Sequence, residues 1–259
     1  MDLGIAGRKA IVCASSRGLG KACARALAEA GCEVIINGRD AKTLNATAAE
    51  LSQITGAKVI AVAADVATPD GQKALLAACP QPDILINNNA GPPLRDFRQL
   101  SRQQLIDGVT ANMIVAIELI QKVIDPMMQR RFGRILNITS GAVKAPLAGL
   151  DLSSGARAGL TAFLAGVART VADKNVTIIH ILPGAFDTDR LRGTLSKNAE
   201  AKGVSVTQVA ADRIATIPAR RFGDPAEFGA AAAFLCSSQA GYITGQNLLI
   251  DGGLFPGAF

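Results

Sequence analysis

The sequence predicts an α/β fold, in which a single doubly wound parallel sheet is covered by helices on both faces. Three observations support this prediction: apolar runs typical of strands alternate with longer alanine-rich segments, the runs are nearly continuous in apolar residues, and no linker or low-complexity tract interrupts them. Strands buried on both faces of a parallel sheet have this continuous apolar character. Handed crossover connections make such a sheet doubly wound. We therefore expect one domain over residues 1–259.

Seven apolar runs are predicted as strands because each is short and bounded by polar or glycine residues. They are residues 9–15, 33–39, 58–66, 83–89, 133–140, 176–184 and 247–253. Five segments of helical period are predicted as helices. They are residues 18–31, 41–55, 105–131, 154–174 and 225–238, and Gly31 closes the first of them.

Residues 187–221 depart from this alternation. They contain no predicted strand and many charges, and they lie between the sixth strand and the last helix. In doubly wound sheets, ligands bind outside the carboxyl ends of the strands. We expect this segment to be a substrate lid at that edge.

Composition narrows the class of protein. No tract is long and apolar enough to span a bilayer, and the first residues lack the pattern of a secretory signal. His180 is the only histidine, so a histidine-based metal site is not expected. An odd number of scattered cysteines favours free thiols in a reducing compartment, and we expect a cytoplasmic protein without a metal. The cysteines are Cys13, Cys23, Cys32, Cys79 and Cys236.

The net charge of +6 is spread along the chain, with local pairs at Arg130–Arg131 and Arg220–Arg221. A nucleic-acid-binding protein would need a clustered basic face with reading elements, so no nucleic-acid partner is expected. A solvated surface explains these charges. A docking patch for an anionic substrate or partner is the alternative, and it stays open.

A glycine-containing turn follows the first predicted strand. Its residues Ser15, Ser16, Arg17, Gly18, Leu19 and Gly20 are predicted to bind the phosphates of a dinucleotide. Gly18 and Gly20 let the backbone approach a phosphate, and the helix that follows offers free N–H groups and the positive end of its dipole.

The end of the second predicted strand indicates which dinucleotide binds. NAD sites place a carboxylate there for the ribose hydroxyls. This chain has Asn37 and Arg39 instead, and Arg17 can converge on the same point. Guanidinium groups bind phosphate in two-pronged fashion, so NADP(H) is predicted over NAD(H). Asp40 is expected to cap the next helix.

Further motifs continue to the end of the chain. They are "CASSRGLG" at residues 13–20, Asp65 with Val66, "NNNAG" with Asn88 and Asn89, Asn112 in the middle of a helix, Ser140 after "NIT", Pro183–Gly184 with Phe186 and Thr188, and "YITGQNLLIDGG". Together these motifs resemble the classical short-chain dehydrogenases/reductases, from end to end. The resemblance implies a Rossmann-type fold and hydride transfer between a nicotinamide and a carbonyl or secondary alcohol.

The resemblance also implies roles for these residues. Asp65 and Val66 would contact the adenine, and Asn88 would match the central asparagine of the family's "NNAG" element. Asn112 would organise a proton-relay water. Ser140 would bind the substrate oxygen. The nicotinamide carboxamide and phosphate would be held by Pro183, Gly184, Phe186 and Thr188. The C-terminal segment would pack in a homotetramer.

The chain departs from the family at its "YxxxK" motif. Ser153 stands where the tyrosine is expected and Arg157 where the lysine is expected. Guanidinium stays protonated and cannot act as a base, so Ser140, Ser153, Arg157 and Asn112 are predicted as a catalytic group that works without the usual phenol. The only tyrosine is Tyr242, expected to be locked in the C-terminal segment, and His180 is expected to be a hydrogen-bonded core residue.

A divergent group with serine and arginine at these positions resembles 3-oxoacyl-acyl-carrier-protein reductases. We therefore predict an NADP(H)-dependent reductase of a small carbonyl substrate, a class that includes acyl thioesters. Arg131 and Lys174 are predicted to be exposed charges at helix ends, and docking of an acidic carrier at these two residues is the alternative. The proton donor is left open between ordered water, the ribose hydroxyl, Asp151 and Lys144. The alternative function is a nucleotide-binding sensor or structural subunit with impaired or no redox catalysis.

Overall fold

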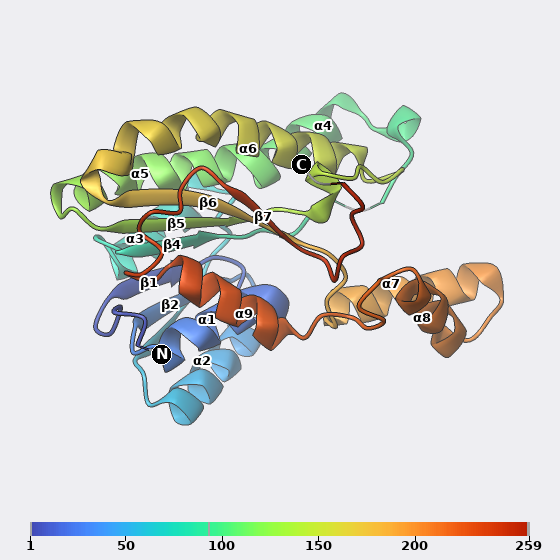
Figure 1. Ribbon diagram of the computed structural model, residues 1–259, viewed down its shortest axis with the longest axis horizontal. Coiled ribbons are helices and arrows are strands. Elements are labelled where there is room, and N and C mark those ends of the chain that lie inside the picture. The colour runs from blue at the N-terminus through green and yellow to red at the C-terminus, as the bar shows by residue number, and fades with distance from the viewer. Residues whose placement is uncertain (1, 93, 258–259) are drawn as a thin grey trace.

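The structure is a computed structural model that describes residues 2–92 and 94–257 (Figure 1). Its centre is one seven-stranded sheet in the order β3-β2-β1-β4-β5-β6-β7, and every neighbouring pair is parallel. The strands are β1 (Lys9–Val12), β2 (Glu33–Gly38), β3 (Val59–Ala63), β4 (Ile84–Asn87), β5 (Gly133–Ile138), β6 (Val176–Pro183) and β7 (Asn247–Ile250). The strand order reverses between β1 and β4, and this switch point is where such sheets bind ligands.

Helices cover both faces of the sheet, as predicted (Figure 1). Helices α1 (Gly18–Glu29), α2 (Ala41–Thr55) and α9 (Pro225–Leu235) bury one face, in a core that includes Leu27, Leu51 and Phe228. Helices α3 (Pro69–Ala78), α5 (Val115–Gln129) and α6 (Asp151–Val171) bury the other. The continuous apolar character of the strands follows from burial on both sides.

The helix predicted over residues 105–131 begins earlier and is interrupted. A capping box at Ser101 starts α4 (Arg102–Val109), a π-helical turn covers Thr110–Ile114, and α5 follows. Asn112 lies in this π-helical turn. Such turns are rare and occur frequently at functional sites.

Other boundaries also differ from the predictions. Helix α3 was not predicted, although Thr68 caps it through a bond from Gly71 and Pro69 is its first residue. Helix α6 begins at Asp151 rather than at residue 154, so Ser153 is helical. Each strand ends one to three residues before its predicted carboxyl end.

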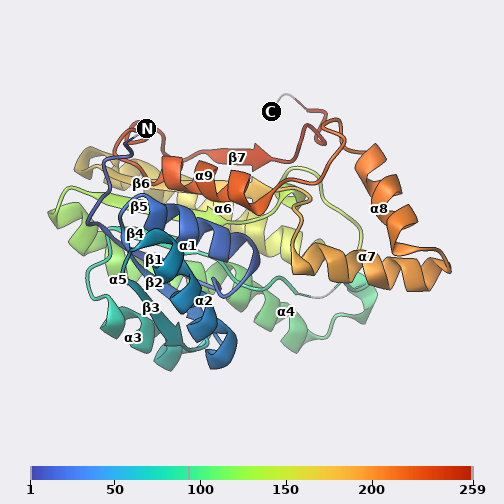
Figure 2. The same cartoon turned by 90° about the horizontal axis from the view of Figure 1, so that it is seen from below.

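Residues 187–221 form two helices, α7 (Asp189–Lys202) and α8 (Val206–Ala215), which project beyond the carboxyl edge of the sheet (Figures 1 and 2). They pack on each other through Leu195, Ala199 and Val209. The segment contains no strand, as predicted. Within residues 2–92 and 94–257, no helix has both the length and the apolar composition needed to cross a membrane.

Candidate active site

The turn between β1 and α1 has the geometry of a phosphate cradle. Six α-helices of the described chain have a side chain that caps the N-terminus, whereas α1, like α5 and α6, has none. Gly18 has a φ of 60°, and a Cβ on Gly20 would lie 2.4 Å from the Ala14 carbonyl oxygen. The free N–H groups and the lack of side chains fit a pyrophosphate at the helix terminus.

Two of the predicted cofactor-binding residues hold this turn in place through their side chains. The Ser15 hydroxyl donates to the Val12 carbonyl at 2.6 Å and accepts from the Asn37 N–H at 3.0 Å. The Asn37 amide donates to the carbonyls of Val62 and Ala64, both at 3.0 Å. Both side chains are buried, so they position the turn on β2 and β3. Ser16 packs against Gly38, which joins the turn to the end of β2.

Arg17 and Arg39 are both exposed, next to the end of β2. Asp40 caps α2 by accepting from the Thr43 N–H at 2.7 Å, as predicted. The pKa of Asp40 is lowered, mainly by this hydrogen bond and further by the charge of Arg17. That effect places Arg17 near the residue that follows Arg39. Within the described chain neither guanidinium pairs with a carboxylate, so both are available to a phosphate.

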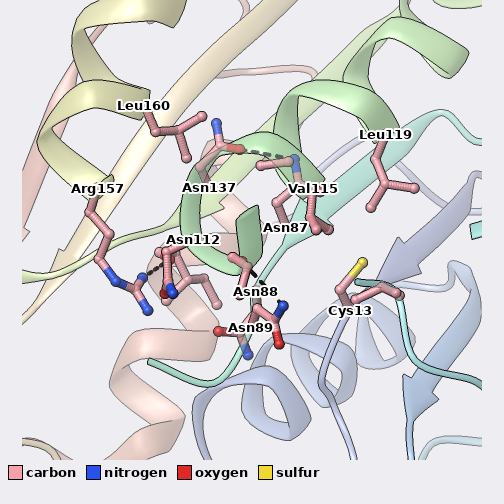
Figure 3. A pocket seen from close by; sticks show the side chains of 14 residues that line it. Cys13, Asn87, Asn88, Asn89, Asn112, Val115, Leu119, Asn137, Arg157 and Leu160 are labelled. Atoms are coloured by element: carbon pink, nitrogen blue, oxygen red, sulfur yellow. Dashed lines mark hydrogen bonds between the residues drawn. The ribbon is translucent and has the colours of Figure 1, made fainter. Parts of the chain in front are cut away.

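A narrow crevice at the carboxyl ends of β1, β4 and β5 brings together several predicted residues (Figure 3). Asn88 donates from its amide to the Ala14 carbonyl at 3.1 Å, and Asn89 donates to the Ala111 carbonyl at 3.1 Å. The first bond fixes the glycine turn and the second fixes the π-helical turn. Val66, Asn112 and Arg157 line the same crevice.

Asn112 is 6% exposed, and its amide nitrogen donates to the Gly108 carbonyl at 3.0 Å. Its side-chain oxygen has no partner among the described residues. A buried polar atom without a partner costs free energy unless water or a ligand satisfies it. This atom is therefore a ready acceptor for a bound water or ligand in the crevice.

Arg157 is 6% exposed and held in one position. Its Nη1 donates to the carbonyls of Ile138 at 2.8 Å and Thr139 at 2.9 Å, and its Nε donates to the Ser153 hydroxyl at 3.2 Å. Burial, together with the charge of Arg190, lowers the pKa of Arg157 to about 10. At neutral pH the guanidinium is still protonated.

Ser140 and Ser153 share a hydrogen-bonding pattern. The Ser140 hydroxyl accepts from the Ala142 N–H at 3.1 Å, and the Ser153 hydroxyl accepts from Arg157. Neither hydroxyl donates to a described residue, so each keeps its own proton for another acceptor. The hydrogen bonds from Arg157 to the carbonyls of Ile138 and Thr139 anchor its guanidinium at the end of β5, directly before Ser140.

The remaining predicted cofactor-binding residues lie around the same edge. Thr188 caps α7 by accepting from the Leu191 N–H at 3.4 Å, and its methyl group would lie 3.8 Å from a Cβ on Gly18. Asp65 accepts from the Ala67 N–H at 3.0 Å. Leu19 packs against the core. Gly184, after Pro183, packs closely on Asp251.

Phe186 is buried, and its ring packs edge-on against Phe228 with the centroids 5.2 Å apart. A Cβ on Gly223 would lie 2.6 Å from the same ring. The ring thus belongs to the base of the α7–α8 segment. Only the backbone of Phe186 remains for the cofactor contact that the sequence predicted.

Two predictions about single residues need correction. His180 is a buried core residue, as predicted, but its Nδ1 has no hydrogen-bond partner among the described residues. Burial lowers its pKa to about 4. Tyr242 is fully exposed rather than locked in the C-terminal segment. The five cysteines are free, as predicted, and all are buried.

Sequence reasoning missed two parts of this site. The first is the guanidinium of Arg190 in α7, which lies near Gly91 and Arg157. The second is a cavity of about 260 Å³ beside the crevice, which shares Ala111 and Asn112 with it. Its other lining residues are Ala90, Pro92, Arg95, Leu100, Gln104, Asp107, Gly108 and Leu152. No sequence signal points to either, because the contributing segments meet only in the folded chain.

Comparisons with known proteins agree with this geometry. A family model described as enoyl-(acyl carrier protein) reductase matches residues 13–255. The chain belongs to the short-chain dehydrogenase/reductase family. The 3-oxoacyl-[acyl-carrier-protein] reductase FabG of Vibrio cholerae is 33% identical over 257 residues, which cover 98% of this chain and 99% of that protein. The NADPH-dependent reductase BacG of Bacillus subtilis is 31% identical over 255 residues, which cover 95% of this chain and 97% of BacG.

Solved structures of this short-chain dehydrogenase/reductase fold are also similar. The L-sorbose reductase of Gluconobacter frateurii, solved with NADPH and L-sorbose, superposes with a TM-score of 0.94 at 27% identity, covering 99% of this chain and all of that one. YwfH, an NADPH-dependent reductase of bacilysin biosynthesis, has a TM-score of 0.91 at 28% identity, covering 97% of this chain and all of that one. These findings confirm the predicted family and the doubly wound fold.

Proposed function

We propose that this chain is an NADP(H)-dependent reductase of a carbonyl substrate, in which Ser140, Ser153 and Arg157 take over the work of the family's tyrosine and lysine. The hydrogen bond from Arg157 Nε to the Ser153 hydroxyl carries the proposal, because it occurs at the end of β5 where Ser140 also lies. NADPH-dependent relatives support the choice of cofactor, together with the free guanidinium groups of Arg17 and Arg39.

The substrate oxygen is held by two hydroxyl groups. Ser140 and Ser153 each accept a hydrogen bond from the protein, so each directs its own proton outward. Two donors and a nearby guanidinium stabilise the negative charge that develops on a carbonyl oxygen during reduction. When bound, the reduced dinucleotide supplies the hydride.

Arg157 holds charge rather than moving protons. It remains protonated near neutral pH even though burial lowers its pKa to about 10. A serine hydroxyl with no adjacent base is a weak acid. We propose that the proton reaches the substrate oxygen through water held at the unpartnered Asn112 oxygen, with the nicotinamide ribose hydroxyl as the alternative route. General acid–base catalysis contributes about 10²–10⁴-fold, so turnover slower than in relatives with the phenol is expected.

The substrate class is proposed from the relatives and from the cavity beside Asn112. The FabG relatives are named for 3-oxoacyl groups on an acyl carrier protein. The cavity of about 260 Å³ has walls that include Leu100, Leu152 and Ala111, which suit an acyl chain or a similar apolar group. A 3-oxoacyl thioester is therefore the first substrate to test, and the α7–α8 segment is proposed as the lid over it.

Assembly and location are part of the same proposal. The exposed apolar side chains of Phe163, Phe234, Tyr242 and Leu248 support a homotetramer built partly by the C-terminal segment. Analytical ultracentrifugation tests this, since a monomer at micromolar concentration would contradict it. Five buried free thiols support a reducing, cytoplasmic location.

The test of the function is NADPH oxidation with 3-oxoacyl thioesters, simple ketones and diketones. We expect turnover in the wild type that falls about 10²-fold or more in Ser140→Ala and Ser153→Ala. Ser154→Ala is the matched control, because Ser154 is buried beside Ser153 but its hydroxyl has no hydrogen-bond partner among the described residues. Its activity should stay near the wild-type value.

The alternative is a protein that binds the dinucleotide without redox catalysis. The buried and unpartnered Asn112 oxygen disfavours it, because a pure binder has no use for a proton relay at that point. Tight NADPH binding with no turnover of any substrate would contradict the reductase and support the binder. Activity that appears only in Ser153→Tyr/Arg157→Lys would do the same, and would show that the scaffold is intact.

A further inference from the structure

Two guanidinium groups meet over one glycine at the edge of the crevice. A Cβ on Gly91 would lie 3.0 Å from Nη2 and 3.2 Å from Nη1 of Arg190, and 3.5 Å from Nη2 of Arg157. Arg157 comes from α6, Arg190 from the first turn of α7, and Gly91 from the segment after β4. Two helices thus place three guanidinium nitrogens around one point beside Gly91.

The donors at this point are unused. Arg157 donates from Nε to the Ser153 hydroxyl and from Nη1 to two backbone carbonyls, and its Nη2 makes no hydrogen bond to a described residue. The side chain of Arg190 makes neither a hydrogen bond nor an ion pair within residues 2–92 and 94–257. The carboxylates of the same region are engaged elsewhere: Asp187 pairs with Arg192, and Asp107 accepts from Gln103.

Two guanidinium groups that lie around the same point repel each other unless an anion lies between them. One of the two, Arg157, is fixed and buried, so it cannot swing away into solvent. The pKa of Arg157 is lowered by burial and also by the charge of Arg190, and the second effect reflects that repulsion. Paired guanidinium groups are well suited to carboxylates and phosphates, because their N–H groups fork onto two oxygens.

We propose that Arg157 and Arg190 together bind a single oxyanion group when the dinucleotide and the substrate occupy the crevice. Gly91 leaves room for it, since a side chain there would take the same space. The oxyanion has two possible sources in the complex: a carboxylate of the substrate, or the nicotinamide-side phosphate of the dinucleotide. The inference rests on the proposed function only for the placement of the dinucleotide, and it does not require turnover.

The test is a calorimetric titration of the full chain in two arms. The first arm measures NADPH and 2′,5′-ADP, which lacks the nicotinamide-side phosphate. The second measures phenylglyoxylate and its uncharged methyl ester on protein saturated with NADP⁺, where no reduction can occur. The variants are Arg190→Gln and Arg190→Lys, and the matched control is Lys197→Gln, an exposed cation of the same helix.

We expect Arg190→Gln to raise one dissociation constant by about tenfold or more, with partial recovery in Arg190→Lys. An increase for NADPH but not for 2′,5′-ADP supports the oxyanion site and assigns it to the dinucleotide phosphate. An increase for phenylglyoxylate but not for its ester supports the site and assigns it to a substrate carboxylate. If Arg190→Gln changes the dissociation constants of NADPH and phenylglyoxylate no more than Lys197→Gln does, the proposal is overturned. A protein that passes this test but never oxidises NADPH would refute the proposed reductase and leave the oxyanion site standing.

Discussion

Arg157 donates a hydrogen bond from Nε to the hydroxyl oxygen of Ser153, at 3.2 Å and one helical turn away. The direction of this bond matters chemically. Because the serine oxygen accepts from a group that is always protonated near neutral pH, the serine proton must point to another acceptor. In the reductase that we propose, that acceptor is the oxygen of a bound carbonyl compound. The pair is thus a fixed hydrogen-bond donor, and it lacks the acidity of a phenol beside an ammonium group.

The Ser153–Arg157 pair predicts a specific pattern in a double-mutant cycle. Arg157→Lys cannot make all three bonds that Arg157 makes, so it should destabilise the fold by about 1–3 kcal/mol and lower kcat/KM. Ser153→Ala should lower kcat/KM with little loss of stability. Steady-state kinetics and urea denaturation of both single variants and the double variant measure this. Fully additive losses in kcat/KM would contradict a functional unit.

The choice of dinucleotide is predicted to depend on Arg39. Arg39→Ala should raise the dissociation constant of NADPH about 10- to 100-fold, since a charge-assisted hydrogen bond contributes about 1.5–3 kcal/mol, and should leave that of NADH nearly unchanged. Lys42→Ala, an exposed cation at the start of α2, is the control. Fluorescence titration with both nucleotides decides the matter. Equal losses for the two nucleotides would show that Arg39 does not read the 2′-phosphate.

The phosphate turn is predicted to carry backbone strain at Ala14. Ala14 has a φ of 45°, in the left-handed region that costs an L-residue roughly 1–2 kcal/mol, and the related family motif has glycine there. Ala14→Gly should therefore leave the free energy of unfolding unchanged or raise it by up to about 1 kcal/mol, after the entropy of the unfolded chain is counted. Chemical denaturation measures it. The control Ala49→Gly, at an exposed position inside α2, should lower the same quantity by about 1 kcal/mol.

Acid should destabilise the fold through His180. Its folded-state pKa of about 4 lies below the ordinary value of 6.5, because burial disfavours the charged form. Between these two values the unfolded chain binds a proton that the native chain does not, so the free energy of unfolding falls as pH falls from 6.5 toward 4. The shift corresponds to a loss on the order of 3 kcal/mol.

Because His180 is the only histidine, its imidazole signal in an NMR titration reports this directly. We expect no protonation of the native protein above about pH 5, and a flatter stability profile in His180→Gln between pH 7 and pH 5. An imidazole that titrates near pH 6.5 in the folded protein would refute the prediction.

Much of this molecule was set by local patterns in the chain. Apolar runs and helical periods predicted the doubly wound sheet. Strands that are buried on both faces are apolar along their whole length, and this pattern can be recognised in the sequence alone. The phosphate-binding turn was predicted from Gly18 and Gly20, and the preference for a 2′-phosphate was predicted from Arg39. Both predictions rest on local properties, the conformation of the backbone and the charge of a side chain. Ser153 and Arg157 were visible because they fall one helical turn apart in a helix without gaps.

Only the tertiary structure decided how those side chains are used. Ser15, Asn37 and Phe186 were predicted as cofactor-binding residues, and the fold also uses their side chains to hold the strands, the turn and the base of the α7–α8 segment together. Asn112 acquired its buried free oxygen from a π-helical turn that helical periodicity does not predict. Arg190 and Arg157 face each other over Gly91 because three distant segments end at one edge of the sheet. Proximity of this kind depends on the packing of the whole chain, and no stretch of sequence encodes it alone.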